Sequence, residues 1–105
     1  MGKVISVSTD KAVKPVNVLG MSNAIQERIM LNPAHEQHED TDFVCVRYGT
    51  VLGSRGSVVP VFRAIIRDGQ PLRLTHPAMT CFMLTFQEAV QLVFQATVTG
   101  KSGEL

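Results

Sequence analysis

The chain has 105 residues, of which 45% are hydrophobic and 18% charged, a size and composition typical of one small globular domain. Ten basic residues against nine acidic ones give a net charge of +1, so bulk charge favours neither a nucleic acid nor a membrane surface as partner. No apolar run approaches the roughly 20 residues of a membrane span, and the start lacks a signal-peptide pattern. Cys45 and Cys81 both lie among apolar residues, which predicts buried, unpaired thiols in a cytoplasmic protein.

The first half of the chain alternates strand and helix patterns. Residues 3–7 form a short β-branched run, which predicts a buried strand that ends in a polar loop. From Val18 to Met30 apolar residues recur at helical spacing, and the helix is expected to end near Asn32-Pro33. An acidic loop over residues 35–42 then leads to a second predicted strand, residues 43–46.

The second half continues this alternation. After a loop punctuated by glycines, residues 58–67 predict a helix with one apolar face, and residues 71–75 predict a short strand. Thr85, with Glu88 three residues later, predicts a capped final helix, after which residues 100–105 are a loop or the start of another strand. The order of strands and helices predicts an α/β fold with right-handed crossovers.

Arginine is concentrated in one part of the chain. Between residues 43 and 81 there are five arginines against one acid, Asp68. The planar guanidinium group matches the oxygen atoms of a phosphate, so this region suggests an anionic ligand. For Arg63 and Arg67 the favoured interpretation is instead a solvated helix surface.

Polar side chains follow the first two predicted strands, where ligands bind in open α/β sheets. The first strand is followed by residues 8–11 (Ser-Thr-Asp-Lys) and the second by residues 47–50 (Arg-Tyr-Gly-Thr). A carboxylate beside an ammonium group, with a hydroxyl before them, can supply an acid, a base and a hydrogen-bond donor. Taken alone, the same residues fit a simpler arrangement in which Asp10 caps a turn and Lys11 is solvated.

The acidic loop contains residues that could be read as metal ligands: His35, Glu36 and His38, with Glu39 and Asp40. Their spacing fits a helix no better than a loop, and their neighbours are polar. We interpret them as a solvated loop and expect no metal site.

Three segments together resemble one enzyme family, and they cover nearly the whole chain: residues 7–20, residues 46–60 and residues 75–82. In this order they are similar to the active-site, nucleotide-sugar and third conserved segments of the UDP-N-acetylglucosamine 4,6-dehydratases. These are nucleotide-sugar enzymes of the extended short-chain dehydrogenase/reductase superfamily. The resemblance implies a partial, Rossmann-like three-layer α/β fold, a UDP-sugar substrate, and NAD or NADP as cofactor.

The resemblance also implies roles for individual residues. Thr9 would hydrogen-bond the sugar near C4, Asp10 would protonate the departing 6-hydroxyl group, and Lys11 would take the C5 proton. The implied cofactor contacts are Ser8, Leu19, Asn23 and Tyr48. The implied contacts to the UDP-sugar are Thr50, Val51, Ser54, Arg55, Gly56, Ser57 and Val58.

The chain departs from the family pattern at several positions. Leu19 and Asn23 stand where the superfamily has a tyrosine and a lysine, and the lysine normally holds the nicotinamide ribose. Thr50 replaces an asparagine, and Cys81 replaces an arginine that contacts the nucleotide. No Gly-x-Gly-x-x-Gly motif is present. We therefore expect residues 1–105 to be a single fragment with the catalytic and nucleotide-sugar segments but no cofactor-binding unit, inactive by itself.

Two alternatives stay open from the sequence. A fragment of a related nucleotide-sugar epimerase would share the same motifs. A non-catalytic binding or oligomerisation module would instead use the incomplete sheet, whose apolar edge and face a partner chain or a second copy could cover.

Overall fold

The computed structural model describes residues 2–32 and 40–105 of the chain. The helix predicted over residues 58–67 is confirmed, and so is the helix predicted from Val18, which ends at Met30 and not near Asn32-Pro33. Both long strands extend beyond their predicted ends. In chain order the elements are β1 (Lys3–Thr9), the short 3-10 turn η1 (Asp10–Ala12), α1 (Val18–Met30), β2 (Asp42–Tyr48), β3 (Thr50–Val51), α2 (Val58–Arg67), β4 (Met83–Leu84) and α3 (Phe86–Thr99).

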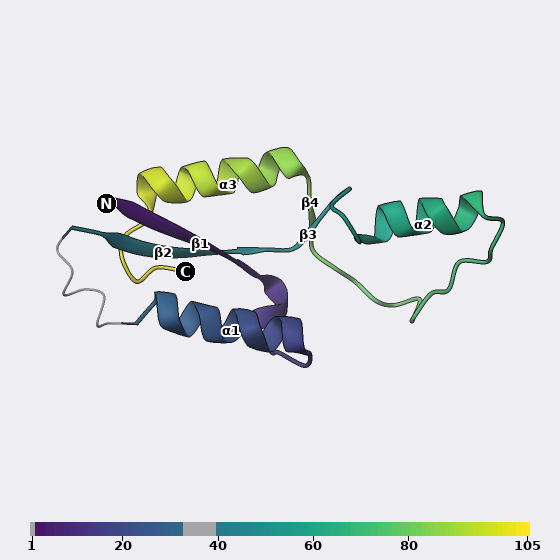
Figure 1. Ribbon diagram of the computed structural model, residues 1–105, viewed down its shortest axis with the longest axis horizontal. Helices are drawn as coiled ribbons and strands as arrows, with labels where there is room; N and C mark the ends of the chain where they lie inside the picture. The colour runs from purple at the N-terminus through teal and green to yellow at the C-terminus, as the bar shows by residue number, and fades with distance from the viewer. Residues whose placement is uncertain (1, 33–39) are drawn as a thin grey trace.

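β1 and β2 pair in parallel and form the centre of three layers. Ser8 lies opposite Arg47, and Thr9 lies opposite Tyr48. α1 and α3 cover opposite faces of this sheet (Figure 1). The α/β class and the three-layer arrangement are therefore confirmed, and the last residues of both strands reach the same edge of the sheet.

Side chains along the two strands alternate between the faces of the sheet. On the α1 face, Ser8 and Arg47 both contact Glu27 of the helix. On the α3 face, the hydroxyl group of Tyr48 donates to the backbone carbonyl of Ala89. The core between the layers is small, and its buried hydrophobic residues are Ala12, Val44, Cys45, Val46 and Ala89.

A second parallel sheet consists of β3 and β4, with two residues in each strand. The Thr50 N–H donates to the Phe82 carbonyl at 2.7 Å, and the Leu52 N–H donates to the Leu84 carbonyl at 2.9 Å. β3 follows β2 after Gly49, and β4 leads directly into α3, so the small sheet connects the three-layer part to α2 and the loops around it (Figure 1).

The strand predicted over residues 71–75 is wrong. These residues form no strand in the structure. The strand that follows α2 is β4, farther along the chain. Leu72 and Leu74 alternate with a polar residue, but both are exposed, Leu74 by 71%. Alternation indicates a strand only where a neighbouring strand supplies hydrogen bonds, and none pairs with this segment within the described residues.

The final helix and the residues after it follow the predicted pattern. Thr85 and Glu88 form the predicted capping box at the start of α3. Beyond the helix, the Gly103 N–H donates to the Phe43 carbonyl and the Cys45 N–H donates to the Glu104 carbonyl, both at 2.9 Å. Residues 103–104 thus run beside β2 although they are not a strand. Among the described residues, no helix is both long and apolar enough to cross a membrane.

Candidate functional site

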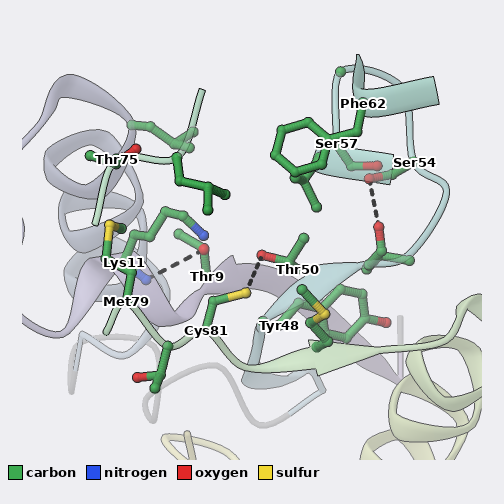
Figure 2. Close-up of a pocket in the computed structure, with 18 of the residues that line it drawn as sticks. Thr9, Lys11, Tyr48, Thr50, Ser54, Ser57, Phe62, Thr75, Met79 and Cys81 are labelled. Carbon is green, nitrogen blue, oxygen red and sulfur yellow. Dashed lines mark hydrogen bonds between the residues drawn. The ribbon is translucent and has the colours of Figure 1, made fainter. Parts of the chain in front are cut away.

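A pocket of about 920 Å³ opens beyond the carboxyl ends of β1 and β2. Its walls are the η1 turn with the start of α1, the chain from β3 into α2, and the segment over residues 73–83. Figure 2 shows Thr9 and Lys11 on one side, Ser54 and Ser57 on another, and Thr50 between them. This is the edge of the sheet at which the sequence predicts a ligand.

The pocket gathers most of the predicted site residues. Ser8, Asp10 and Asn23 lie outside its lining among the described residues. The predicted residues within the lining are Thr9, Lys11, Leu19, Tyr48, Thr50, Val51, Ser54, Arg55, Gly56, Ser57 and Val58. The structure therefore brings the segment that ends β1 and the segment that precedes α2 to one cavity.

The residues predicted to be catalytic form a compact polar turn. Thr9 caps η1, since its Oγ1 accepts a hydrogen bond from the Lys11 N–H at 3.4 Å. Oδ1 of Asp10 accepts from Thr9 Oγ1 at 3.1 Å and from Lys11 Nζ at 3.1 Å. A carboxylate in contact with a hydroxyl and an ammonium group can exchange protons with both, which is the arrangement that acid–base chemistry requires.

Gly20 allows α1 to pack closely on this turn. A Cβ atom at position 20 would lie 2.5 Å from the carbonyl oxygen of Lys11 and 3.2 Å from Cα of Pro15. Both neighbours are backbone or ring atoms that cannot rotate away. The missing side chain of Gly20 therefore sets the position of the Lys11 backbone relative to the helix.

The loop that leads into α2 has the features of an anion site. Gly53 and Gly56 adopt φ angles of 79° and 75°, which other residues rarely adopt, so the chain can fold tightly there. Ser57 stands at the N-cap of α2, yet its hydroxyl makes no capping bond and is buried without a hydrogen-bond partner. The first N–H groups of a helix have no acceptor within the helix and attract negative charge.

The charges on the lining are all positive. Lys11, Arg55 and Arg73 line the pocket, and no Asp or Glu does so among the described residues. Asp10 neutralises Lys11 at 3.1 Å, whereas the ion pairs of the described chain do not include Arg55 or Arg73. Two uncompensated guanidinium groups therefore remain for a ligand with negative charge.

The segment before β4 contributes three residues that the sequence did not assign to the site, Arg73, His76 and Met79. Cys81, at the position where the resemblance implies a contact to the nucleotide, also lines the pocket. The prediction that Cys81 is a core residue is wrong, because its side chain is exposed and its Sγ lies 3.8 Å from Thr50 Oγ1. The predicted free thiols are confirmed, and Cys45 is buried as predicted. The third segment of the resemblance, residues 75–82, was the one sequence feature that indicated a role for this part of the chain in the site.

A partly buried ion pair, in which Glu27 is buried and Arg47 half-buried, adjoins the strand ends that line the pocket. Arg47 donates from Nε to Glu27 Oε1 at 2.8 Å and from Nη2 to Glu27 Oε2 at 2.7 Å, and Ser8 Oγ donates to Oε1 at 2.5 Å. The Arg47 guanidinium group is therefore engaged by Glu27 within the fold, whereas its place in the arginine-rich region suggested an anionic ligand. The hydrogen bonds from Arg47 hold the pKa of Glu27 below its ordinary value of 4.5, although burial opposes this shift.

Acid is therefore expected to destabilise the chain in part through Glu27. Because its pKa is lower in the folded state, its stabilisation is present above about pH 4.5 and is lost as the pH falls through the folded value. Urea unfolding between about pH 6 and about pH 3 should show a larger loss for the natural chain than for Glu27→Gln. The pKa of Glu88 is also lowered, by its hydrogen bonds with Thr85, but Glu88 contributes equally to both chains. Equal acid dependence would contradict this prediction.

The four predicted cofactor contacts are divided between two environments. Leu19 and Tyr48 line the pocket, but the Tyr48 hydroxyl is engaged by the Ala89 carbonyl, and burial raises the Tyr48 pKa. The Ser8 side chain is buried against Glu27. Asn23 is half-buried on α1 and donates from Nδ2 to the Leu19 carbonyl at 2.8 Å.

Of the residues considered as metal ligands, His35, Glu36, His38 and Glu39 lie outside the described residues, and Asp40 is exposed. Over residues 2–32 and 40–105, no group of three or more His, Cys, Asp or Glu residues is placed to hold a metal ion.

Comparison with known proteins places the whole chain in one group. A family model described as polysaccharide biosynthesis protein matches residues 1–105. The capsular polysaccharide biosynthesis protein CapD of Staphylococcus aureus is 45% identical over 105 residues, which are 100% of this chain and 17% of that protein. A UDP-glucose 4-epimerase of Rickettsia canadensis is 42% identical over 106 residues, covering 100% of this chain and 31% of the epimerase.

A solved structure shows the same fold. The X-ray structure of Pen from Bacillus thuringiensis superposes with a TM-score of 0.88 at 34% sequence identity, over 98% of this chain and 32% of that chain. The chain thus spans between 17% and 32% of the length of these similar proteins.

Proposed function

We propose that this chain, which belongs to the polysaccharide biosynthesis protein family, binds a UDP-sugar in the pocket and takes part in its modification. The observation that carries the proposal is one cavity that has a cationic wall, with no Asp or Glu in its lining among the described residues, and the Thr9–Lys11 turn at another wall. A nucleotide sugar needs both features, because its diphosphate is anionic and its sugar carries hydroxyl groups. The names of the similar proteins, which include a capsular polysaccharide protein and a UDP-glucose 4-epimerase, support this class of ligand.

The diphosphate would lie at the start of α2. Arg55 and Arg73 offer one guanidinium group for each phosphate, and the Ser57 hydroxyl can donate to a phosphate oxygen. The first N–H groups of the helix point to the same place. The remaining predicted substrate contacts line the same pocket: Thr50, Val51, Ser54, Gly56 and Val58.

The sugar would lie against the turn after β1. In the reaction that we propose, Thr9 hydrogen-bonds the sugar near C4, and Lys11 first passes its ammonium proton to the Asp10 carboxylate, 3.1 Å away. The neutral Lys11 amine then takes the proton from C5, and the Asp10 acid protonates the departing 6-hydroxyl group, which leaves as water as the C5–C6 double bond forms. The contacts of Asp10 Oδ1 with both neighbours, each at 3.1 Å, support a shared proton network. This chemistry is that of a 4,6-dehydratase.

NAD or NADP is the cofactor that we propose for the full reaction, in which it would accept hydride from C4 and return it at C6. Leu19 and the ring of Tyr48 would contact it from the pocket. Ser8 and Asn23 stay predicted contacts, although the structure shows both side chains engaged within the protein. We expect no turnover from this chain without a cofactor-binding unit, and a cytoplasmic location, which its two free cysteines favour.

The epimerase alternative uses the same pocket. Epimerisation at C4 also begins with hydride removal there, but it needs no departure of the 6-hydroxyl group. The 42% identity with a UDP-glucose 4-epimerase favours keeping it as a second candidate. Product analysis of an intact relative distinguishes the two, because only the dehydratase forms a 4-keto-6-deoxy sugar.

An oligomerisation role remains a further candidate because apolar side chains are exposed on the helices. Ile25 and Ile29 on α1 are 62% and 60% exposed, and Phe94 on α3 is 66% exposed. A second copy or a partner chain could cover such surfaces. Light scattering on the purified chain tests this role, and a monomer over a range of concentrations would count against it.

Calorimetric titration of UDP into the chain tests the proposed ligand. We expect Arg55→Gln and Arg73→Gln each to weaken UDP binding about tenfold, the effect of losing one charge-assisted hydrogen bond at an exposed site. Arg63→Gln is the matched control, because Arg63 lies on α2 outside the lining. An equal loss in all three variants would show only a bulk charge effect, and unchanged affinity in the two pocket variants would overturn the proposal.

A further inference from the structure

The carboxylate of Glu27 connects three elements immediately behind the pocket. Glu27 belongs to α1, Ser8 to β1 and Arg47 to β2, and the three hydrogen bonds that join them measure 2.5, 2.8 and 2.7 Å. Glu27 is 6% exposed and Ser8 is 4% exposed. A carboxylate that accepts two bonds from one guanidinium group and a third from a hydroxyl has a fixed orientation.

The partners of Glu27 each precede a residue of the pocket. Ser8 is followed by Thr9, and Arg47 is followed by Tyr48. Thr9 and Tyr48 lie opposite each other in the sheet and both line the cavity. Because side chains alternate along a strand, an anchor on the α1 face leaves the next residue free to face the opposite way.

The strand ends are also held from the other face. The Tyr48 hydroxyl donates to the Ala89 carbonyl of α3, so β2 is attached to a helix on each side. β1 is attached to α1 through Ser8 and also through Gln26, whose Nε2 donates to Ser6 Oγ at 2.6 Å and to the Val7 carbonyl at 3.3 Å. α1 meets the turn after β1 again at Gly20, where the Lys11 carbonyl fits closely. Through Glu27, α1 is hydrogen-bonded to both strands at one residue.

We propose that Glu27 is a positioning residue, which fixes the ends of β1 and β2 against α1 so that Thr9 and Lys11 face the sugar end of the pocket. It touches no ligand itself and acts through Ser8 and Arg47. The proposal rests on the proposed function, because it concerns the sugar-facing wall of the same site. The wall at the start of α2, where the diphosphate would bind, does not depend on Glu27 in this proposal.

A merely structural role for Glu27 makes a different prediction. If the ion pair only stabilises the fold, its loss will loosen every element and weaken all ligands alike. If Glu27 positions the turn, its loss will act on the turn and on sugar contacts, and will spare the diphosphate contacts of Arg55. The ratio of affinities for UDP-N-acetylglucosamine and UDP separates these two cases.

Three variants of the 105-residue chain make the comparison. Glu27→Gln keeps the shape but removes the charge, and Ser8→Ala removes one hydrogen bond and leaves the ion pair with Arg47 intact. Ser8→Ala keeps the test informative if Glu27→Gln does not fold. Glu104→Gln is the matched control, because that carboxylate accepts a hydrogen bond from the Lys101 N–H in the C-terminal turn, outside the lining.

The first measurement needs no ligand. Amide hydrogen exchange should become about tenfold faster over residues 9–12 in Glu27→Gln and Ser8→Ala, with little change over α3. The control should exchange like the natural chain. Unchanged exchange over residues 9–12 in a folded variant, or an equal rise throughout α3, would overturn the positioning role.

The second measurement compares ligands. The affinity for UDP-N-acetylglucosamine relative to UDP should fall by about threefold to tenfold in both variants, while the affinity for UDP itself stays unchanged. Equal losses for the two ligands would overturn the positioning role. If the natural chain binds neither ligand, the proposed function fails, and the exchange measurement still decides whether Glu27 orders the turn.

Discussion

Replacing Gly49 with alanine is expected to lower the free energy of unfolding by about 3 kcal/mol and to remove most UDP binding. A Cβ atom at position 49 would lie 2.4 Å from the carbonyl oxygen of Phe82 and 2.9 Å from its carbonyl carbon. Backbone atoms cannot rotate aside, so β4 would have to move. That movement would break the Thr50 to Phe82 hydrogen bond and separate two walls of the pocket.

Urea unfolding and UDP titration of the same variant test this expectation. Gly2→Ala is the matched control, since no atom lies within 4 Å of a Cβ built at Gly2. The control should match the natural chain in both measurements. A Gly49→Ala chain of natural stability would show that β3 and β4 do not pair as closely as the structure indicates.

Replacing Gly20 with alanine should cost about 2 kcal/mol of stability and should weaken sugar contacts more than diphosphate contacts. The added methyl group would meet the Lys11 carbonyl oxygen at 2.5 Å, and overpacking of this kind typically costs about 1–3 kcal/mol. The higher helix propensity of alanine offsets up to about 1 kcal/mol of that cost. To relieve the contact, the turn that holds Thr9 and Lys11 would shift away from α1.

Ser22→Ala provides the comparison for Gly20→Ala. Ser22 is an exposed residue of the same helix, and its hydroxyl donates to the Leu19 carbonyl within the helix. This control should leave stability and ligand affinity nearly unchanged. A Gly20→Ala chain that binds UDP-N-acetylglucosamine as tightly as the natural chain would contradict the close packing of α1 on the turn.

The sequence predicted the longer elements, because a helix of several turns or a strand of several residues carries a recognisable pattern of apolar residues. α2 begins and ends at the predicted residues, and α1 begins at the predicted Val18 but ends at Met30, before the predicted end near Asn32-Pro33. A repeated apolar spacing defines both helices. β3 and β4 were missed since strands of two residues carry no pattern. Residues 71–75 were predicted to be a strand from alternation alone. Whether such a segment forms a strand depends on a neighbouring strand to pair with, and alternation does not show whether one is there.

The same distinction applies to the site. The polar ends of β1 and β2 were predicted to meet because parallel strands end at one edge of a sheet, and Thr9 and Tyr48 do lie opposite each other. The Glu27–Arg47 pair joins residues 20 positions apart on different elements, and no local spacing points to it. Cys81 lies among apolar neighbours in sequence, but these neighbours are largely exposed, with Phe82 at 79%.

The contrast between the two cysteines gives the chain a built-in chemical reporter. Cys45 is 1% exposed, and burial raises its pKa, so it presents almost no thiolate to a reagent. Cys81 is exposed and lines the pocket. A thiol-specific dye added to the unmodified chain would therefore label a single position at the mouth of the cavity. The rate of that labelling then follows occupancy of the cavity in real time, without any substitution in the protein.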